Sequence, residues 1–320
     1  MSDEHGGLVV CRPPPITVRG DTQGLTLLSD LHLGAANVDY GLIHRELLAA
    51  AEHEDRVLIN GDVFDAILPR DAKRYSPVAL HPRILGSEDL INRLVDWAFE
   101  LLSPYADRID LVGVGNHDTA VSKHHSTDPV LLLVRRLNDF LITRGLSHRV
   151  WYGGYCGFMD YRFHFTGQKR EPILRRPSPP TDEQVGRKVS GNRPKKDQRR
   201  FVLYYHHGFG KSGSLSGAAG DYQRTTHVEG ADAVWLAHQH TRVVSHVRRV
   251  HCPARGIHPG LRDVYFLRTG AYFDTYLGQS QGDIAKSGRK YSYAADQGYQ
   301  PLGNGGLRVV ISKNSVKVIQ

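Results

Sequence analysis

Short apolar segments that end in potential metal ligands constrain this chain more than any other feature of its sequence. The first covers residues 25–28 and runs directly into Ser29-Asp30-Leu31-His32. Side chains two residues apart in an extended segment point the same way, so Asp30 and His32 can converge on one point. A carboxylate and a neutral imidazole together suit a divalent metal ion. This pair alone does not establish a site.

Four later segments end in the same way. Potential ligands follow each apolar run: Asp62 after 57–59, Asn116 after 109–114, His206 after 201–205, and His238 with His240 after 233–237. Each of them taken alone is explained as well by a loop cap or by one more of the chain's 18 histidines. Five such strand ends in order predict one shared site, because ligands of open α/β sheets lie at the carboxyl ends of strands.

The apolar periodicity predicts an α/β chain with α+β character. Helical spacing alternates with the first three strands, which gives a β-α-β-α-β-α order for the first half. The expected helices cover 41–55, 87–102 and 128–145, and 66–86 and 208–220 are expected to be loops. From Val150 onward we expect a second, more antiparallel set of strands at 155–166, 201–205, 233–237, 243–250, 264–273 and 307–319.

Composition indicates a soluble globular protein that carries one basic segment. The 320 residues are 40% hydrophobic and 23% charged, and no apolar run approaches a membrane span. The absence of a signal sequence and the three scattered cysteines predict a cytoplasmic protein. Residues 167–200 hold eleven Lys or Arg against four acidic residues, which is nearly all of the net charge of +8. We therefore expect a single domain over 1–320 with a flexible basic insertion at 167–200, either solvated or in contact with phosphates.

The ligand types at these strand ends indicate a pair of metal ions. Two divalent ions about 3.5–4 Å apart can clamp the attacking and leaving oxygens of a displacement at phosphorus, and a water shared by them becomes the nucleophile. Asp62 is the expected bridging carboxylate. We expect Asp30, His32 and one of the closing histidines to coordinate one ion together with Asp62. Asn116, His206 and the other closing histidine are expected to coordinate the second ion.

Three further polar residues are candidates for supporting roles. We expect His117, oriented by its neighbour Asp118, to protonate the leaving alcohol or to hold a phosphoryl oxygen. Asp65 follows the bridging carboxylate by three residues and is expected to orient a ligand histidine.

The order D-x-H, G-D-x-x-D, G-N-H-D, H and H-x-H resembles the calcineurin-like metallophosphoesterase superfamily over roughly residues 25–275. The resemblance implies a four-layer αββα sandwich of two mixed sheets flanked by helices. It also implies that His240 coordinates the same ion as Asp30 and His32, and that His238 coordinates the other ion. His117 is implied to act on the leaving group.

Two positions depart from the superfamily pattern. Ala237 stands where a glycine usually precedes the closing H-x-H, a change that we expect to be tolerated. The fourth motif is a double histidine, and the pattern favours His206 as the ligand with His207 as the alternative.

The resemblance predicts a metal-dependent phosphoester hydrolase, first of all a phosphodiesterase or nuclease acting on nucleotides or nucleic acid. Arg70, Lys211 and Tyr272 are the expected substrate contacts. The first two motifs also resemble the UDP-2,3-diacylglucosamine pyrophosphohydrolases, although the G-N-H-D motif departs from that family. A phosphomonoesterase, a protein phosphatase or a non-catalytic scaffold would also be compatible with these motifs. Manganese is the expected metal, and iron, zinc or nickel would also suit the ligands. The sequence does not indicate an oligomeric state.

Overall fold

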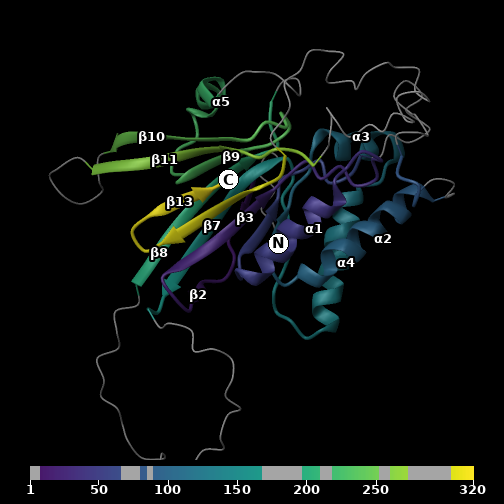
Figure 1. Ribbon diagram of the computed structural model, residues 1–320, viewed down its shortest axis with the longest axis horizontal. Helices are drawn as coiled ribbons and strands as arrows, with labels where there is room; N and C mark the ends of the chain where they lie inside the picture. The colour runs from purple at the N-terminus through teal and green to yellow at the C-terminus, as the bar shows by residue number, and fades with distance from the viewer. Residues whose placement is uncertain are drawn as a thin grey trace, which may run out of the picture.

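The computed structural model contains two β-sheets packed face to face, with helices outside them (Figure 1). It confirms the predicted sandwich of two mixed sheets flanked by helices. The residues that the structure describes are 8–65, 80–84, 89–167, 197–209, 218–251, 260–272 and 304–320.

The first sheet has the strand order β13-β12-β3-β4-β5-β6. Its strands β3 (Thr22–Leu28), β4 (Arg56–Ile59), β5 (Ile109–Val112) and β6 (Trp151–Tyr152) are parallel. The hairpin of β12 (Leu307–Ser312) and β13 (Val316–Ile319) is antiparallel and pairs with β3. The prediction that 307–319 belongs to the second set of strands is therefore wrong. Local periodicity identified these strands but could not specify a partner at the opposite end of the chain.

The second sheet has the strand order β1-β7-β8-β9-β11-β10, and β2 also pairs with β7. The strands are β1 (Leu8–Cys11), β2 (Ile16–Val18), β7 (Cys156–Phe165), β8 (Asp197–His206), β9 (Ala233–Leu236), β10 (Val243–His251) and β11 (Gly260–Arg268). β8, β9 and β11 run parallel to one another, whereas β7 and β10 are antiparallel to their neighbours β8 and β11. Both sheets are therefore mixed.

Three of the helices begin where an aspartate caps the first turn. The carboxylates of Asp39, Asp89 and Asp128 accept hydrogen bonds from backbone amides of α1 (Tyr40–Glu52), α2 (Leu90–Leu102) and α4 (Pro129–Thr143). A 3₁₀ turn, η2 (Ser103–Tyr105), follows α2. The helices α3 (Asn116–His125) and α5 (Ala218–Thr225) were not anticipated, since neither has a sustained apolar face.

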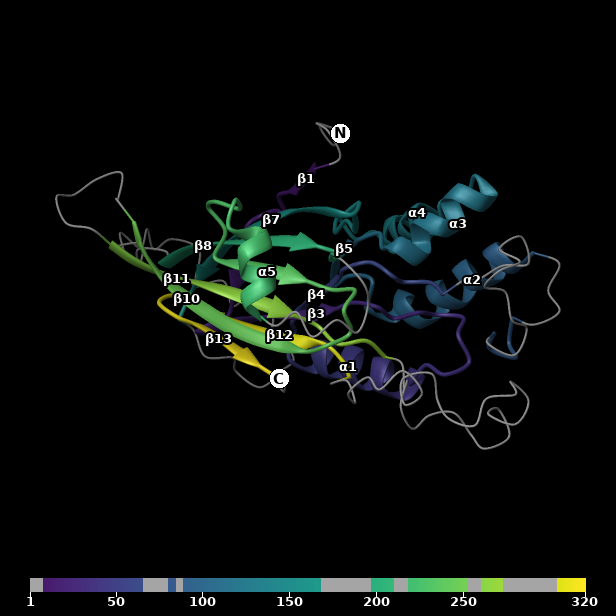
Figure 2. The same cartoon turned by 90° about the horizontal axis from the view of Figure 1, so that it is seen from above.

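Three clusters of buried apolar side chains pack the layers together. One packs α1, α2 and α4 against the outer face of the first sheet, and a second fills the space between the two sheets. The third covers the outer face of the second sheet below α5, which Figure 2 shows lying over that sheet. Within the described part of the chain, no helix combines the length and apolar character needed to cross a bilayer.

Candidate metal centre

The loops that follow β3 and β4 lie side by side because their parallel pairing continues past the strand ends. The backbone amide of Asp30 donates to Gly61 O at 3.0 Å, and the amide of His32 donates to Asp62 O at 3.0 Å. These bonds hold two predicted ligand segments in register at one edge of the sheet.

The backbone at the predicted ligands is strained. Among the described residues, seven other than glycine have positive φ, and five of them are predicted metal ligands: Asp30 (52°), His32 (47°), Asp62 (45°), His238 (70°) and His240 (58°). Left-handed backbone is unfavourable for residues with a Cβ and concentrates at functional sites, where the surrounding fold enforces it. The clustering of this strain on the candidate ligands supports a functional role for them.

Two groups of three side chains bring the predicted ligand atoms together. Asp30, His32 and His240 form one group. One potential ligand atom from each, a carboxylate oxygen or an imidazole nitrogen, lies within 4.8 Å of the other two. His240 Nε2 lies 3.4 Å from Asp30 Oδ1 and 3.4 Å from His32 Nε2. Asp62, His207 and His238 form the second group under the same limit. Each group offers the oxygen and imidazole ligands that divalent transition metals accept.

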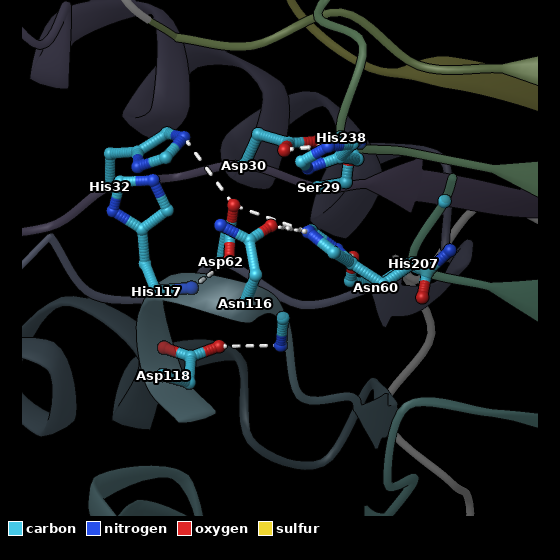
Figure 3. Close-up of polar contacts among 12 residues, drawn as sticks. Ser29, Asp30, His32, Asn60, Asp62, Asn116, His117, Asp118, His207 and His238 are labelled. Carbon is cyan, nitrogen blue, oxygen red and sulfur yellow. Dashed lines mark hydrogen bonds and ion pairs between the residues drawn. The ribbon is translucent and has the colours of Figure 1, made fainter. Parts of the chain in front are cut away.

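Asp62 lies between the two groups (Figure 3). Its Oδ2 is 3.1 Å from His207 Nε2 in one group and 4.0 Å from His32 Nε2 in the other. Its Oδ1 accepts a hydrogen bond of 2.8 Å from the amide of His117, and only 1% of the residue is exposed. The buried carboxylate is therefore placed where a ligand shared by two ions would be needed.

The structure brings His207, and not the favoured His206, to this centre. Side chains alternate along β8, so Leu203 and Tyr205 face the other sheet while Tyr204 faces outward. His207 continues the inward set, whereas the Nδ1 of His206 accepts a hydrogen bond of 2.9 Å from the amide of Gly208. The alternative, His207, and not His206, therefore lies among the candidate ligand atoms of this centre.

The hydrogen bonds of His207 leave one nitrogen directed at oxygen atoms. Its Nδ1–H donates to the carbonyl oxygen of Asn60 at 2.9 Å, and its Nε2 faces Asp62 Oδ2 and Asn116 Oδ1, the latter at 3.2 Å. A neutral imidazole in this tautomer carries a lone pair on Nε2, which needs a proton or a metal ion between it and those acceptors. The donor set at this position fits a divalent cation.

Charge at the centre favours a bound cation. Burial lowers the pKa of His207, but the adjacent Asp62 carboxylate outweighs it and raises that pKa to about 9. Burial and the charge of Asp62 raise the pKa of Asp118 to about 7. Carboxylates gathered in a buried space thus draw protons onto their neighbours, and a metal ion would supply the same positive charge.

His117 is oriented by Asp65 and not by Asp118, contrary to the prediction. His117 Nδ1 lies 3.0 Å from Asp65 Oδ1, and its ring contacts the ring of His32 edge-on, with centroids 4.8 Å apart. Although burial lowers the pKa of His117, the bond to Asp65 and the nearby carboxylates raise it to about 9. His32, Asp65 and His117 also form a third group of potential ligand atoms within 4.8 Å of one another. The hydrogen bond shows that Asp65 orients His117, the candidate general acid. The prediction was that Asp65 orients a histidine that binds metal.

The carboxylate of Asp118 instead accepts hydrogen bonds from backbone amides. Asp118 is fully buried, and its carboxylate accepts hydrogen bonds from the amides of Val63 (3.2 Å), Phe64 (3.0 Å) and Gly115 (2.9 Å). It thereby joins the segment that follows Asp62 to the segment that precedes Asn116, two parts of the site that come from different strands. The spacing of the G-N-H-D motif could not distinguish this role from a contact with His117.

Tyr272 does not line a substrate site. Its side chain is fully buried and its hydroxyl donates to Glu46, while its amide donates to Asp30 O at 3.4 Å. This residue supports the backbone of a ligand, which corrects its predicted contact with substrate. Arg70 and Lys211 lie outside the described residues, as does most of the 167–200 segment.

Two residues of the centre were not singled out from the sequence. Asn60 receives the Nδ1–H of His207 and donates its own Nδ2 to His206 O at 3.0 Å. Ser29 donates to Asp30 Oδ2 at 2.5 Å and lies 2.6 Å from Thr269 Oγ1. Both are adjacent or nearly adjacent to a ligand in the sequence, and that position is the signal that could have identified them.

Among the solved structures that are similar to this chain is the calcineurin-like phosphoesterase YfkN from Bacillus subtilis, with 12% sequence identity over 69% of this chain and 73% of that chain. The TM-score of that superposition is 0.30. No protein-family model matches the sequence, and no curated protein matches it.

Proposed function

We propose that this protein is a metal-dependent phosphoester hydrolase of the calcineurin-like type that uses two divalent ions. The observation that carries the proposal is the position of Asp62 between two groups of ligand side chains, with one carboxylate oxygen 3.1 Å from His207 and 4.0 Å from His32. A pair of ions at such a carboxylate activates water and neutralises charge on phosphoryl oxygens.

The residues divide into two ligand sets. Asp30, His32, His240 and Asp62 would hold one ion. Asp62, His207, His238 and Asn116 would hold the other. Manganese is our first choice, and iron, zinc or nickel would suit the same oxygen and nitrogen donors.

His117 is the proposed general acid. Its Nδ1 is engaged by Asp65, so the proton on Nε2 is the one available to the leaving oxygen. The carboxylates around His117 keep this imidazole protonated near neutral pH. A positioned acid of this kind contributes about 10²–10⁴-fold to a rate.

The experiment that tests the proposal is hydrolysis of bis-p-nitrophenyl phosphate by protein loaded with manganese. Asp62→Asn preserves shape but removes the shared charge, and should abolish turnover and metal loading. Asp160→Asn is the matched control, because Asp160 is a similarly buried carboxylate (4% exposed) that lies on β7 in contact with arginines. Equal turnover by the wild type and Asp62→Asn would refute the proposed site.

We further propose a diester substrate, a nucleotide or a nucleic acid, in agreement with the chain's net charge of +8. The substrate class is tested by comparing bis-p-nitrophenyl phosphate with p-nitrophenyl phosphate. A strong preference for the monoester would select a phosphomonoesterase or protein phosphatase instead. Turnover of a UDP-diacylglucosamine alone would select the nucleotide-lipid pyrophosphohydrolase.

A further inference from the structure

Two hydroxyl groups meet where the apolar layer between the two sheets ends. Leu27 of β3 faces the second sheet, and Ser29, two residues later, continues on the same side. Leu267 of β11 faces the first sheet, and Thr269 follows it by two residues in the same way. The amide of Thr269 donates to Leu236 O at 3.3 Å, which extends the pairing of β11 with β9 past the strand ends. Ser29 and Thr269 are fully buried, and their hydroxyl oxygens lie 2.6 Å apart.

The donors and acceptors around these hydroxyls are compatible with one direction of hydrogen bonding. The indole Nε1–H of Trp235 can only donate, and it bonds Thr269 Oγ1 at 3.0 Å. The single hydroxyl proton of Ser29 goes to Asp30 Oδ2 at 2.5 Å, so its oxygen accepts in the contact with Thr269. Thr269 therefore accepts from the indole and donates to Ser29. We refer to Trp235, Thr269 and Ser29 as the Trp-Thr-Ser network.

The network engages one carboxylate oxygen of Asp30 and turns the other toward the ligand histidines. Oδ2 receives the proton of Ser29, and the amide of His238 lies 3.2 Å from each of the two oxygens. Oδ1 lies 3.4 Å from His240 Nε2, within the first ligand group. Figure 3 shows Ser29 and His238 beside Asp30. The bond from Ser29 thus fixes the rotation of the carboxylate.

The network also joins ligands that come from different sheets. Asp30 follows β3 of the first sheet, whereas Trp235 lies on β9 of the second sheet, and β9 leads to His238 and His240. The indole ring packs in the apolar cluster between the sheets. A hydroxyl that lost its partner in this buried region could not replace it with water at no cost. The position of Asp30 is therefore set relative to β9 before an ion binds.

We infer that Thr269 is a positioning residue of the metal centre, which couples the fixed indole of Trp235 through Ser29 to the carboxylate of Asp30. This inference rests on the proposed function, because it assigns the network to the ion that Asp30 would hold. Side chains that hydrogen-bond a metal ligand orient it, and their loss typically costs about 10–100-fold in metal affinity.

Calorimetric titration of the full chain with Mn²⁺, after removal of bound metal, tests the inference. Thr269→Val keeps the shape of the side chain but removes the hydroxyl, and it should weaken one of two binding events about 10–100-fold. Thr269→Ser keeps the hydroxyl and should restore the wild-type affinity. Equal affinity of the wild type and Thr269→Val, or a loss in Thr269→Ser as large as that in Thr269→Val, would overturn the inference.

Thr26→Val is the matched control. Thr26 is a buried threonine of β3 (7% exposed) whose hydroxyl donates to Asp55 at 3.1 Å, so its loss should leave both binding events unchanged. Urea unfolding of the metal-free variants separates positioning from support of the fold. If Thr269→Val and Thr26→Val both lower the free energy of unfolding and both bind Mn²⁺ as the wild type does, Thr269 only supports the fold and the inference falls.

The indole of Trp235 provides a readout that does not depend on turnover. An ion bound to Asp30 draws electron density from the carboxylate and alters the hydrogen bonds that lead back to the indole. The Nε1–H resonance of Trp235, assigned with Trp235→Phe, should therefore shift when the diamagnetic ion Zn²⁺ is added to the wild type. In Thr269→Val this response should be lost, while the indole of Trp151 on β6 responds in neither protein. An equal response of Trp235 in both proteins would contradict the inference.

Metal binding separates failure of the inference from failure of the proposed function. If Mn²⁺ binding depends on Thr269 as expected but no phosphoester is hydrolysed, the proposed hydrolase falls and the network stands. If the wild type hydrolyses bis-p-nitrophenyl phosphate and Thr269→Val binds Mn²⁺ equally well, the hydrolase stands and the inference falls. A wild type that binds no divalent ion would refute both.

Discussion

Asp118→Ala is the substitution that most directly probes how the centre is assembled. The carboxylate of Asp118 accepts hydrogen bonds from three backbone amides, two that follow Asp62 and one that precedes Asn116. Alanine would leave these three amides without an acceptor in a region from which water is excluded. The two segments would then lose the group that ties them together.

The magnitude depends on the number of stranded amides. Each buried donor that loses its partner costs about 1–3 kcal/mol, so three of them cost about 3–9 kcal/mol by simple addition. Water that enters the space left by the carboxylate offsets part of this cost. We expect Asp118→Ala to lower the free energy of unfolding by about 4 kcal/mol, at the upper end of single substitutions.

Equilibrium unfolding in urea measures this loss, and Asp89→Ala is the matched control. Asp89 is an exposed aspartate that caps α2 through a single backbone amide at 3.2 Å, so its loss should cost about 1 kcal/mol. Manganese binding by Asp118→Ala should weaken together with stability. If Asp118→Ala is no less stable than Asp89→Ala and changes only the pH dependence of turnover, Asp118 acts on His117 and its role in joining the two segments is refuted.

Further contacts in the structure lead to three more predictions. His207→Ala should lose bound manganese as measured by elemental analysis, whereas His206→Ala should keep it, and equal loss would contradict the ligand assignment. Gly115→Ala should lower turnover about a hundredfold, since a Cβ there would lie 2.1 Å from the shared carboxylate, and undiminished turnover would contradict this. The pKa of Asp160 is lowered by its bond to Arg200, so its charge stabilises the fold above the unfolded pKa of about 4, and this contribution is lost as pH falls through the folded pKa. Asp160→Asn should therefore flatten the loss of stability in acid, as followed by urea unfolding at several pH values, and an unchanged acid profile would contradict it.

Most of the centre could be predicted from the sequence because the ligands follow strands. Parallel strands bring their carboxyl ends to one edge, so Asp30, His32 and Asp62 had to meet once β3 and β4 were recognised. The closing His238 and His240 were found in the same way after β9. No distance was needed for these assignments, only the positions at which apolar runs end.

The remaining errors concern information that local patterns do not contain. Whether His206 or His207 faces the centre depends on which face of β8 meets the other sheet, and both histidines stand at the strand end. The contacts of Asp65 and Asp118 depend on how α3 packs, and that helix has no apolar periodicity by which it could be recognised. Pairing of β12 with β3 depends on contacts between distant segments.

Anomalous diffraction from crystals grown with manganese tests the central claim most directly. We predict two anomalous peaks about 3.5–4 Å apart on either side of Asp62, one near Asp30 and His32 and the other near His207. Crystals of the Asp62→Asn variant grown with manganese in the same way should show neither peak at full occupancy. A single peak, or peaks elsewhere in the molecule with none beside Asp62, would contradict the proposal of a two-metal phosphoester hydrolase.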